Sequence, residues 1–224
     1  TKLFIKRIPL KEDIYSLIFS KSLSAIKCEN TDTEQFTSED GEGQYALFVM
    51  TVYECLGEFA SNAPEYFDKS KFIQTVQKFQ KSKRINDVIL STDVLGRIYE
   101  SNPSGISGLY LKFLIKIIID SLQFCDGNNQ PFPIISLRRI IDANNQILSN
   151  HLNTIVQQMD KIMNLENNGQ AYYHQTIASS ISFILSLARI QGEQFPYQSY
   201  LPTIISLLPE KYESQNIYSS IILI

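Results

Sequence analysis

The residues best suited to catalysis or metal binding are few and widely separated in this sequence. The only two histidines are His151 and His174, and neither has a carboxylate or a cysteine at the spacing that metal ligands adopt. The three cysteines fit neither a disulfide framework nor a zinc knuckle, and they indicate a reducing compartment. The sequence suggests no Ser-His-Asp or Cys-His arrangement, which a nucleophilic enzyme would need. We therefore expect no enzyme and no cofactor, and turnover dependent on a histidine would be needed to revise this.

One segment carries half of a dinucleotide-binding pattern. Residues 41–46 read Gly-Glu-Gly-Gln-Tyr-Ala and match G-x-G-x-x-A at the start of a predicted helix. The apolar strand that precedes this pattern in nucleotide-binding proteins is missing, because residues 29–42 are acidic and polar. We expect these glycines to end a loop.

The segment from Cys28 to Gly43 is acidic and has no Lys or Arg. We interpret it as a mobile acidic loop, and its uncompensated charge makes it a candidate site for a basic partner segment. The alternative is a disordered solubilising loop. Its six carboxylates are Glu29, Asp32, Glu34, Glu39, Asp40 and Glu42.

Two clusters of basic residues are candidate contacts for phosphate or for an acidic partner. The alternative is that they lie at solvent-exposed helix ends, because the helix dipole favours cations near a helix C-terminus. The clusters are Lys78, Lys81, Lys83 and Arg84, and Arg138 with Arg139.

The composition excludes several classes of protein. With 44% hydrophobic and 19% charged residues the chain is neither disordered nor collagen-like, and a net charge of −3 disfavours binding to nucleic acid mainly by charge. The longest apolar run, residues 109–119, is broken by Lys112 and Lys116, so we expect no membrane span.

Apolar residues recur at spacings of three and four along most of the chain, which predicts amphipathic helices. The helices form pairs whose first members begin near residues 44, 84, 133, 171 and 214, so the interval is roughly 40 residues, as in HEAT and armadillo repeats. Three turns within pairs carry Ser-Asn, at residues 61–62, 101–102 and 149–150. We expect each asparagine to end a helix in the left-handed conformation. Gln191-Gly192 is the predicted break in the fourth pair.

We therefore predict an all-α, HEAT/armadillo-like α-solenoid of about four to five helix pairs. Residues 1–43 would hold a helix of a preceding repeat, from Leu10 to Lys27, followed by the acidic loop. Residues 44–224 would form the array, and the helix from residue 106 to 124 would lie innermost. Because no polar cap closes the sequence, we expect it to be a piece of a longer array. The predicted repeats are 44–83, 84–132, 133–170, 171–213 and a truncated 214–224.

The fourth pair resembles the second helix and inter-repeat turn of importin-β (karyopherin-β) nuclear transport receptors. The residues that carry the resemblance are Phe195-Pro196-Tyr197, Tyr200-Leu201-Pro202-Thr203-Ile204-Ile205 and Leu207-Leu208-Pro209-Glu210-Lys211-Tyr212-Glu213. Residues 8–13, Ile-Pro-Leu-Lys-Glu-Asp, resemble the same turn. Because the chain has no Trp, the Trp-Asn arrays with which some members hold localisation peptides are absent.

The resemblance implies a non-enzymatic scaffold of the cytoplasm and nucleus that carries protein cargo through nuclear pores. Its implied partners are the cargo, a Ran-type GTPase and phenylalanine-glycine nucleoporins, and the family's functional residues cannot be carried over to positions in this chain. The first alternative is a HEAT or armadillo scaffold subunit of a phosphatase, chromosome-organising or ciliary complex. An RNA-binding helical repeat is a further alternative, which the net charge disfavours.

Overall fold

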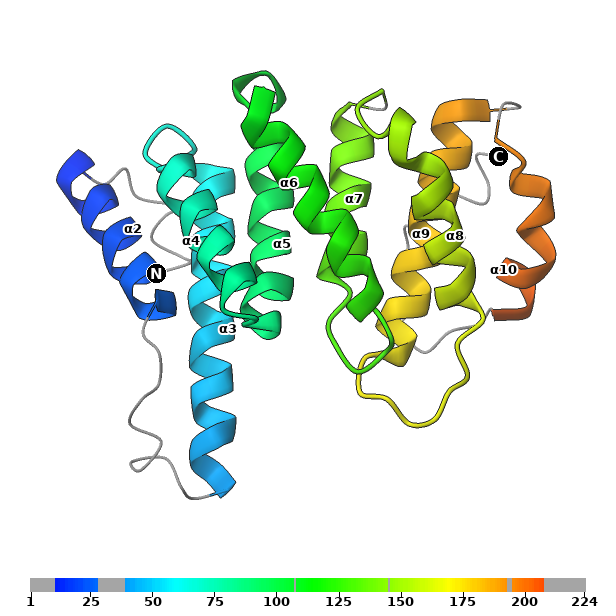
Figure 1. The fold of residues 1–224 in the computed structure, drawn as a ribbon, viewed down its shortest axis with the longest axis horizontal. Coiled ribbons are helices and arrows are strands. Elements are labelled where there is room, and N and C mark those ends of the chain that lie inside the picture. The colour runs from blue at the N-terminus through cyan, green and yellow to red at the C-terminus, as the bar shows by residue number, and fades with distance from the viewer. Residues whose placement is uncertain (1–10, 28–38, 107, 145, 193–194, 208–224) are drawn as a thin grey trace. The chain divides into compact units, whose positions relative to one another are not determined.

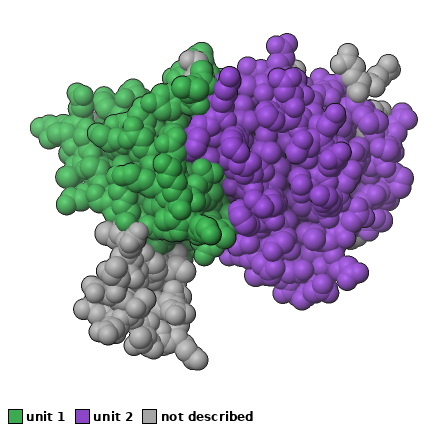
Figure 2. All heavy atoms as spheres, viewed as in Figure 1, with its two compact units in different colours: residues 1–110 green, residues 111–224 purple. Residues whose placement is uncertain are grey.

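The computed structural model describes residues 11–27, 39–106, 108–144, 146–192 and 195–207, and gives only the backbone of residues 39–46 and Tyr197. Every regular element in these residues is an α-helix or a 3-10 helix, and they contain no strand (Figure 1). The predicted all-α fold is therefore confirmed. The chain divides into two compact units, Thr1–Tyr110 and Leu111–Ile224 (Figure 2). The predicted division after residue 43 and the single solenoid stay predictions.

The first unit is built on α3, which packs against α2 on one side and α5 on the other. α4 also packs against α5, so the second helix of one pair contacts the first helix of the next. The short 3-10 helix η2 (Pro103–Gly105) follows α5 and packs on it. The bounds are α2 Glu12–Lys27, α3 Glu39–Asn62, α4 Lys69–Lys81 and α5 Ile85–Ser101.

The second unit repeats this arrangement around α9. The first helices of successive pairs, α7 and α9, pack together, and α8 packs against α9 as α4 does against α5. α6 (Gly108–Ser121) spans the boundary between the units. The other bounds are η3 Leu122–Phe124, α7 Phe132–Ala143, η4 Ser149–His151, α8 Leu152–Met163, α9 Tyr173–Gln191, η6 Tyr197–Ser199 and α10 Leu201–Leu207.

The cores of the two units differ in character. In the first unit, aromatic rings from α2, α3 and the α3–α4 turn stack on one another, with Tyr15 4.6 Å from Tyr66 and 5.7 Å from Phe59 between ring centroids. Such ring pairs add to the free energy gained by burying their apolar area. In the second unit, α9 is buried on nearly all sides, and its small buried residues Ser180, Ser182 and Ser186 allow neighbouring helices to approach closely.

The predicted loop before α3 is wrong over residues 39–43, because the helix already begins at Glu39. Glu39, Asp40 and Glu42 therefore belong to the first turns of α3. Gly41 and Gly43 lie inside this helix and do not end a loop. The earlier acidic positions, Glu29, Asp32 and Glu34, lie outside the described residues.

The Ser-Asn turns end helices at two of the three predicted places, but not in the predicted way. α3 ends at Asn62 and α5 ends at Ser101. Asn102 has φ −154° and caps η2 with its side chain, which accepts a hydrogen bond from the Gly105 N–H. Asn150 lies within η4. Among the described non-glycine residues, only Lys83 has a positive φ, of 57°.

Two further helix predictions differ from the structure. α7 ends at Ala143, well before the predicted end near Leu148, and Leu148 is nevertheless fully buried. α6 is not buried on every side, as an innermost helix would be: Leu114, Ile117 and Ile118 are buried, but Leu109 is 83% exposed. The predicted break at Gly192 is confirmed, because this residue caps α9 with a φ of 56°. The truncated pair from residue 214 lies outside the described residues.

Candidate interaction site

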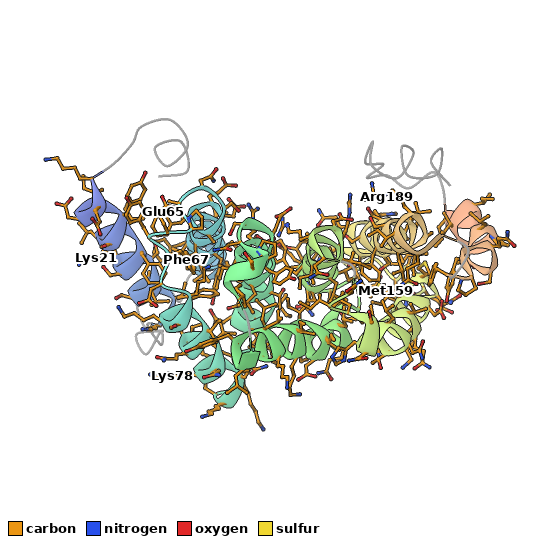
Figure 3. All side chains as sticks on the ribbon, turned by 90° about the horizontal axis from the view of Figure 1, so that it is seen from above. Lys21, Glu65, Phe67, Lys78, Met159 and Arg189 are labelled. Atoms are coloured by element: carbon orange, nitrogen blue, oxygen red, sulfur yellow. The ribbon has the colours of Figure 1, made fainter. Side chains whose placement is uncertain are left out.

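A groove runs along α2 in the first unit and has a volume of about 490 Å³. We call it the α2 groove. Its far wall is the turn between α3 and α4 together with the first turn of α4, and Figure 3 shows Phe67 on this turn beside α2. The lining residues are Glu12, Ser16, Phe19, Ser20, Leu23, Ser24, Lys27, Glu65, Tyr66, Phe67, Asp68 and Lys71.

The helical period of α2 explains why a groove forms there. Ser16, Ser20 and Ser24 recur every four residues, so they form one exposed stripe of small side chains along the helix. The stripe borders the buried Phe19, which meets Phe67 edge to face with ring centroids 4.9 Å apart. Small residues beside large buried rings leave a trough that a further helix or peptide can fill.

The charges of the α2 groove differ between its two ends. Glu12 begins α2 and Lys27 ends it, so a negative and a positive side chain mark opposite ends of the groove. Glu65 precedes Tyr66, which stacks on Tyr15 near the start of α2. The groove therefore combines an aromatic floor with an acidic end and a basic end, which suits a polar, amphipathic peptide.

Arg84 is a structural residue, although it belongs to a predicted binding cluster. Its Nε donates a 2.8 Å hydrogen bond to Asp87, and its Nη2 donates a 2.9 Å bond to the carbonyl of Ile26 at the end of α2. Its guanidinium also lies 4.4 Å from the centre of the Phe79 ring. Asp87 in turn accepts a 2.9 Å bond from the Tyr53 hydroxyl. Arg84 thus joins α2, α4 and α5, and is not available as a separate contact.

The hydroxyl of Tyr53 stays protonated in this network. Burial first, and then the negative charge of Asp87, raise the pKa of Tyr53 far above its usual value. Tyr53 therefore acts as a permanent hydrogen-bond donor between α3 and α5.

The other three members of the first basic cluster lie together at the end of α4. Lys78 and Lys81 are in its last turn, Lys83 follows two residues later, and all three side chains are exposed. Figure 3 shows Lys78 along α4, apart from Phe67 and the turn that carries it. We call Lys78, Lys81 and Lys83 the basic face.

The second basic cluster serves the packing of α7 on α9. Arg138 donates a 2.6 Å hydrogen bond to Ser182 and lies 3.6 Å from Asp142. Asp142 also pairs with Arg189 at 3.2 Å. Arg139 likewise has a partner. Arg138 and Arg189 join α7 to α9, and the predicted contact of Arg138 and Arg139 with an acidic partner stays a prediction.

The residues considered for catalysis lie on separate elements. His151 ends η4 and is exposed, whereas His174 lies in the first turn of α9 with its ring 5.3 Å from that of Tyr173. Cys125 is buried, and burial together with the nearby Asp126 raises the pKa of its thiol to about 12. Within the described residues, no group of three or more His, Cys, Asp and Glu side chains could hold a metal ion.

Sequence patterns missed a buried ion network between α3 and α5. Arg97 on α5 pairs with Asp93 on the same helix at 2.9 Å and with Glu58 on α3 at 3.3 Å. Burial opposes the charge of Arg97, but the two carboxylates outweigh it and raise the pKa of the guanidinium. A Cβ on Gly57 would lie 2.9 Å from Cδ of Arg97, so this glycine leaves room for the arginine. The i,i+4 spacing of Asp93 and Arg97 is the one sequence signal of this network.

No helix in the described part of the chain is long and apolar enough to cross a membrane. Comparisons with protein families, curated proteins and solved structures found no match to this chain.

Proposed function

We propose that this protein is a non-enzymatic scaffold built from helix pairs, which binds other proteins along its exposed helix faces. The observation that carries the proposal is the repeated packing within each unit, where α3 lies on α5 and α7 lies on α9. Such packing joins each pair mainly to its neighbours and leaves the outer faces and the grooves between helices for partners. The α2 groove, with its aromatic floor, is a site of this kind.

The test compares the proteins captured by the wild-type chain with those captured by a variant that fills the groove. Ser20→Trp places a large ring in the α2 groove, whereas Leu17→Trp places the same ring at a position on α2 that is 55% exposed and outside the groove. Quantitative mass spectrometry should show proteins retained by the wild type and by Leu17→Trp but lost with Ser20→Trp. A capture profile that is identical for all three chains would contradict a role for this groove.

A more specific proposal is that the scaffold is a karyopherin-type receptor of the cytoplasm and nucleus, which carries protein cargo under the control of a Ran-type GTPase. Its support is the resemblance of residues 195–213 and 8–13 to the family's turns. Binding of GTP-loaded Ran and of phenylalanine-glycine peptides by the full-length protein tests this proposal. If neither binds, a scaffold subunit of another multiprotein complex becomes the better proposal.

A further inference from the structure

α4 and the residues that follow it are strongly basic in a chain whose net charge is −3. Between Asp68 and Asp87 the sequence has no Asp or Glu, and its charged residues are all Lys or Arg. These residues are Lys69, Lys71, Lys78, Lys81, Lys83 and Arg84. Positive charge is therefore concentrated on α4 and the turn that follows it.

The exposed positions of α4 lie on one side of the helix. Lys71, Gln74, Lys78 and Lys81 are spaced by three, four and three residues, so they form one stripe, and all are exposed. The opposite side carries the buried Phe72, Val76 and Phe79. No large apolar side chain of α4 is exposed, so the outward stripe offers a partner charge and hydrogen bonds.

The basic face is not neutralised by the acidic residues that flank α4. Asp68 pairs with Lys71 at 3.0 Å, and Asp87 pairs with Arg84 at 2.8 Å. Lys78, Lys81 and Lys83 form no ion pair within the part of the chain that the structure describes. Within the described residues these three ammonium groups are therefore available to an acidic ligand.

Lys83 occupies a backbone position that favours glycine. The N–H of Arg84 donates to the carbonyl of Phe79, and the N–H of Lys83 donates to that of Gln80, which is the Schellman pattern of helix termination. Lys83 has the left-handed φ of 57° that this pattern requires. The helix dipole favours cations in the last turn, which accounts for Lys78 and Lys81. It does not account for Lys83, because glycine would be more stable at this left-handed position. Helix capping alone therefore does not explain a lysine at this position.

We propose that the basic face binds a short acidic segment of a partner protein. This inference rests on the proposed scaffold function and names the chemistry of one partner. From Lys71 to Lys81 the stripe extends for roughly 15 Å, enough for about four extended residues. The negative net charge of the chain opposes a long polyanion such as nucleic acid or an anionic bilayer, because these would also meet the surrounding surface.

The experiment measures binding of a fluorescein-labelled oligoglutamate peptide to the full chain by fluorescence anisotropy. The test variant is Lys78→Gln/Lys81→Gln/Lys83→Gly, and the control Lys21→Gln/Lys112→Gln/Lys161→Gln removes the same charge from three exposed lysines elsewhere. We expect the test variant to weaken binding by about tenfold and the control by less than about twofold. Binding of the wild type should also weaken as salt is added.

Lys83→Gly alone separates binding from folding. Glycine suits the left-handed position, so this variant should unfold at a higher temperature than the wild type and yet bind the peptide more weakly. Equal losses in the test and control variants, or no binding by the wild type, would overturn the proposal. Tighter binding of a single-stranded oligonucleotide or of anionic vesicles, lost in the test variant, would overturn the partner class. None of these results would alter the capture experiment on the α2 groove, so the scaffold proposal is tested separately.

Discussion

The side chain of Arg84 donates a 2.9 Å hydrogen bond to the backbone carbonyl of Ile26, which lies 58 residues earlier in the chain. This carbonyl belongs to the last turn of α2, where intrahelical donors run out and a cation is favoured by the helix dipole. One arginine thus fixes the end of α2 to the start of α5. It also explains why a residue in a basic cluster can be structural while its neighbours remain exposed.

Replacing Arg84 with alanine should destabilise the first unit. The substitution removes the ion pair with Asp87, the bond to Ile26 and the contact with Phe79, with an expected loss of about 2–3 kcal/mol in the free energy of unfolding. Urea denaturation followed by circular dichroism measures this loss. Lys112→Ala removes a cation from an exposed site and should change stability by less than about 0.5 kcal/mol. Equal effects of the two substitutions would show that the contacts of Arg84 are not stabilising.

Asp68 should make a pH-dependent contribution to stability. It caps α4 by accepting a 3.0 Å bond from the Lys71 N–H, and although its partial burial opposes ionisation, this bond and the charge of Lys71 lower its pKa. A carboxyl with a lowered pKa in the folded state stabilises the protein above its unfolded pKa, and this contribution disappears as the pH falls through the folded pKa. At neutral pH the free energy of unfolding of the wild type should exceed that of Asp68→Asn by about 0.5 kcal/mol. The difference should vanish under strongly acidic conditions, and a difference independent of pH would contradict this assignment.

Thr176 has a fully buried hydroxyl with no hydrogen-bond partner in the described structure. Valine has nearly the same shape and the same branching at Cβ, so Thr176→Val removes a polar group without changing the packing of α9. We expect the free energy of unfolding to rise by about 1 kcal/mol. Thermal and urea denaturation measure the change. A clear loss of stability would mean that the hydroxyl is hydrogen-bonded in solution.

The cysteines at positions 55 and 125 should differ in reactivity. Cys125 is buried and its thiol pKa is raised to about 12, whereas Cys55 is half-buried. Because the thiolate is the reactive form, iodoacetamide should modify Cys55 at least about tenfold faster than Cys125 at mildly alkaline pH. Peptide mass spectrometry gives the two rates, and unfolding in urea should make them similar. Faster labelling of Cys125 in the folded protein would contradict its burial.

Helix periodicity predicted the elements of this fold well and some of their ends poorly. α5 runs from Ile85 to Ser101, close to the predicted start near residue 84 and the predicted turn at residues 101–102, because apolar residues at helical spacing and a Ser-Asn-Pro stop mark it in the sequence. The end of α7 was predicted too late. Leu148 is buried but lies in a turn, and its spacing from the apolar residues of α7 made it look like part of the same helix. The start of α3 was predicted too late because residues 39–43 are acidic and contain two glycines, a composition that also indicates a loop.

The interaction site was only partly visible in the sequence for a related reason. The sequence marks Lys78, Lys81, Lys83 and Arg84 as one cluster, but a contact between Arg84 and Ile26 depends on tertiary packing and has no local signal. The α2 groove likewise requires Phe67, on the turn after α3, to lie against Phe19 on α2. A left-handed backbone at Lys83 could not be expected either, since asparagine and glycine are the residues that usually adopt it.

Hydrogen exchange of the full chain, with and without a protein recovered in the capture experiment, tests the scaffold proposal most directly. The proposal predicts slower exchange of amides on α2 and the α3–α4 turn in the complex, with the buried amides of α9 unchanged. It also predicts that Ser20→Trp abolishes this protection and that Leu17→Trp does not. A complex that leaves exchange in every helix unchanged would contradict the proposal that exposed helix faces of this protein bind its partners.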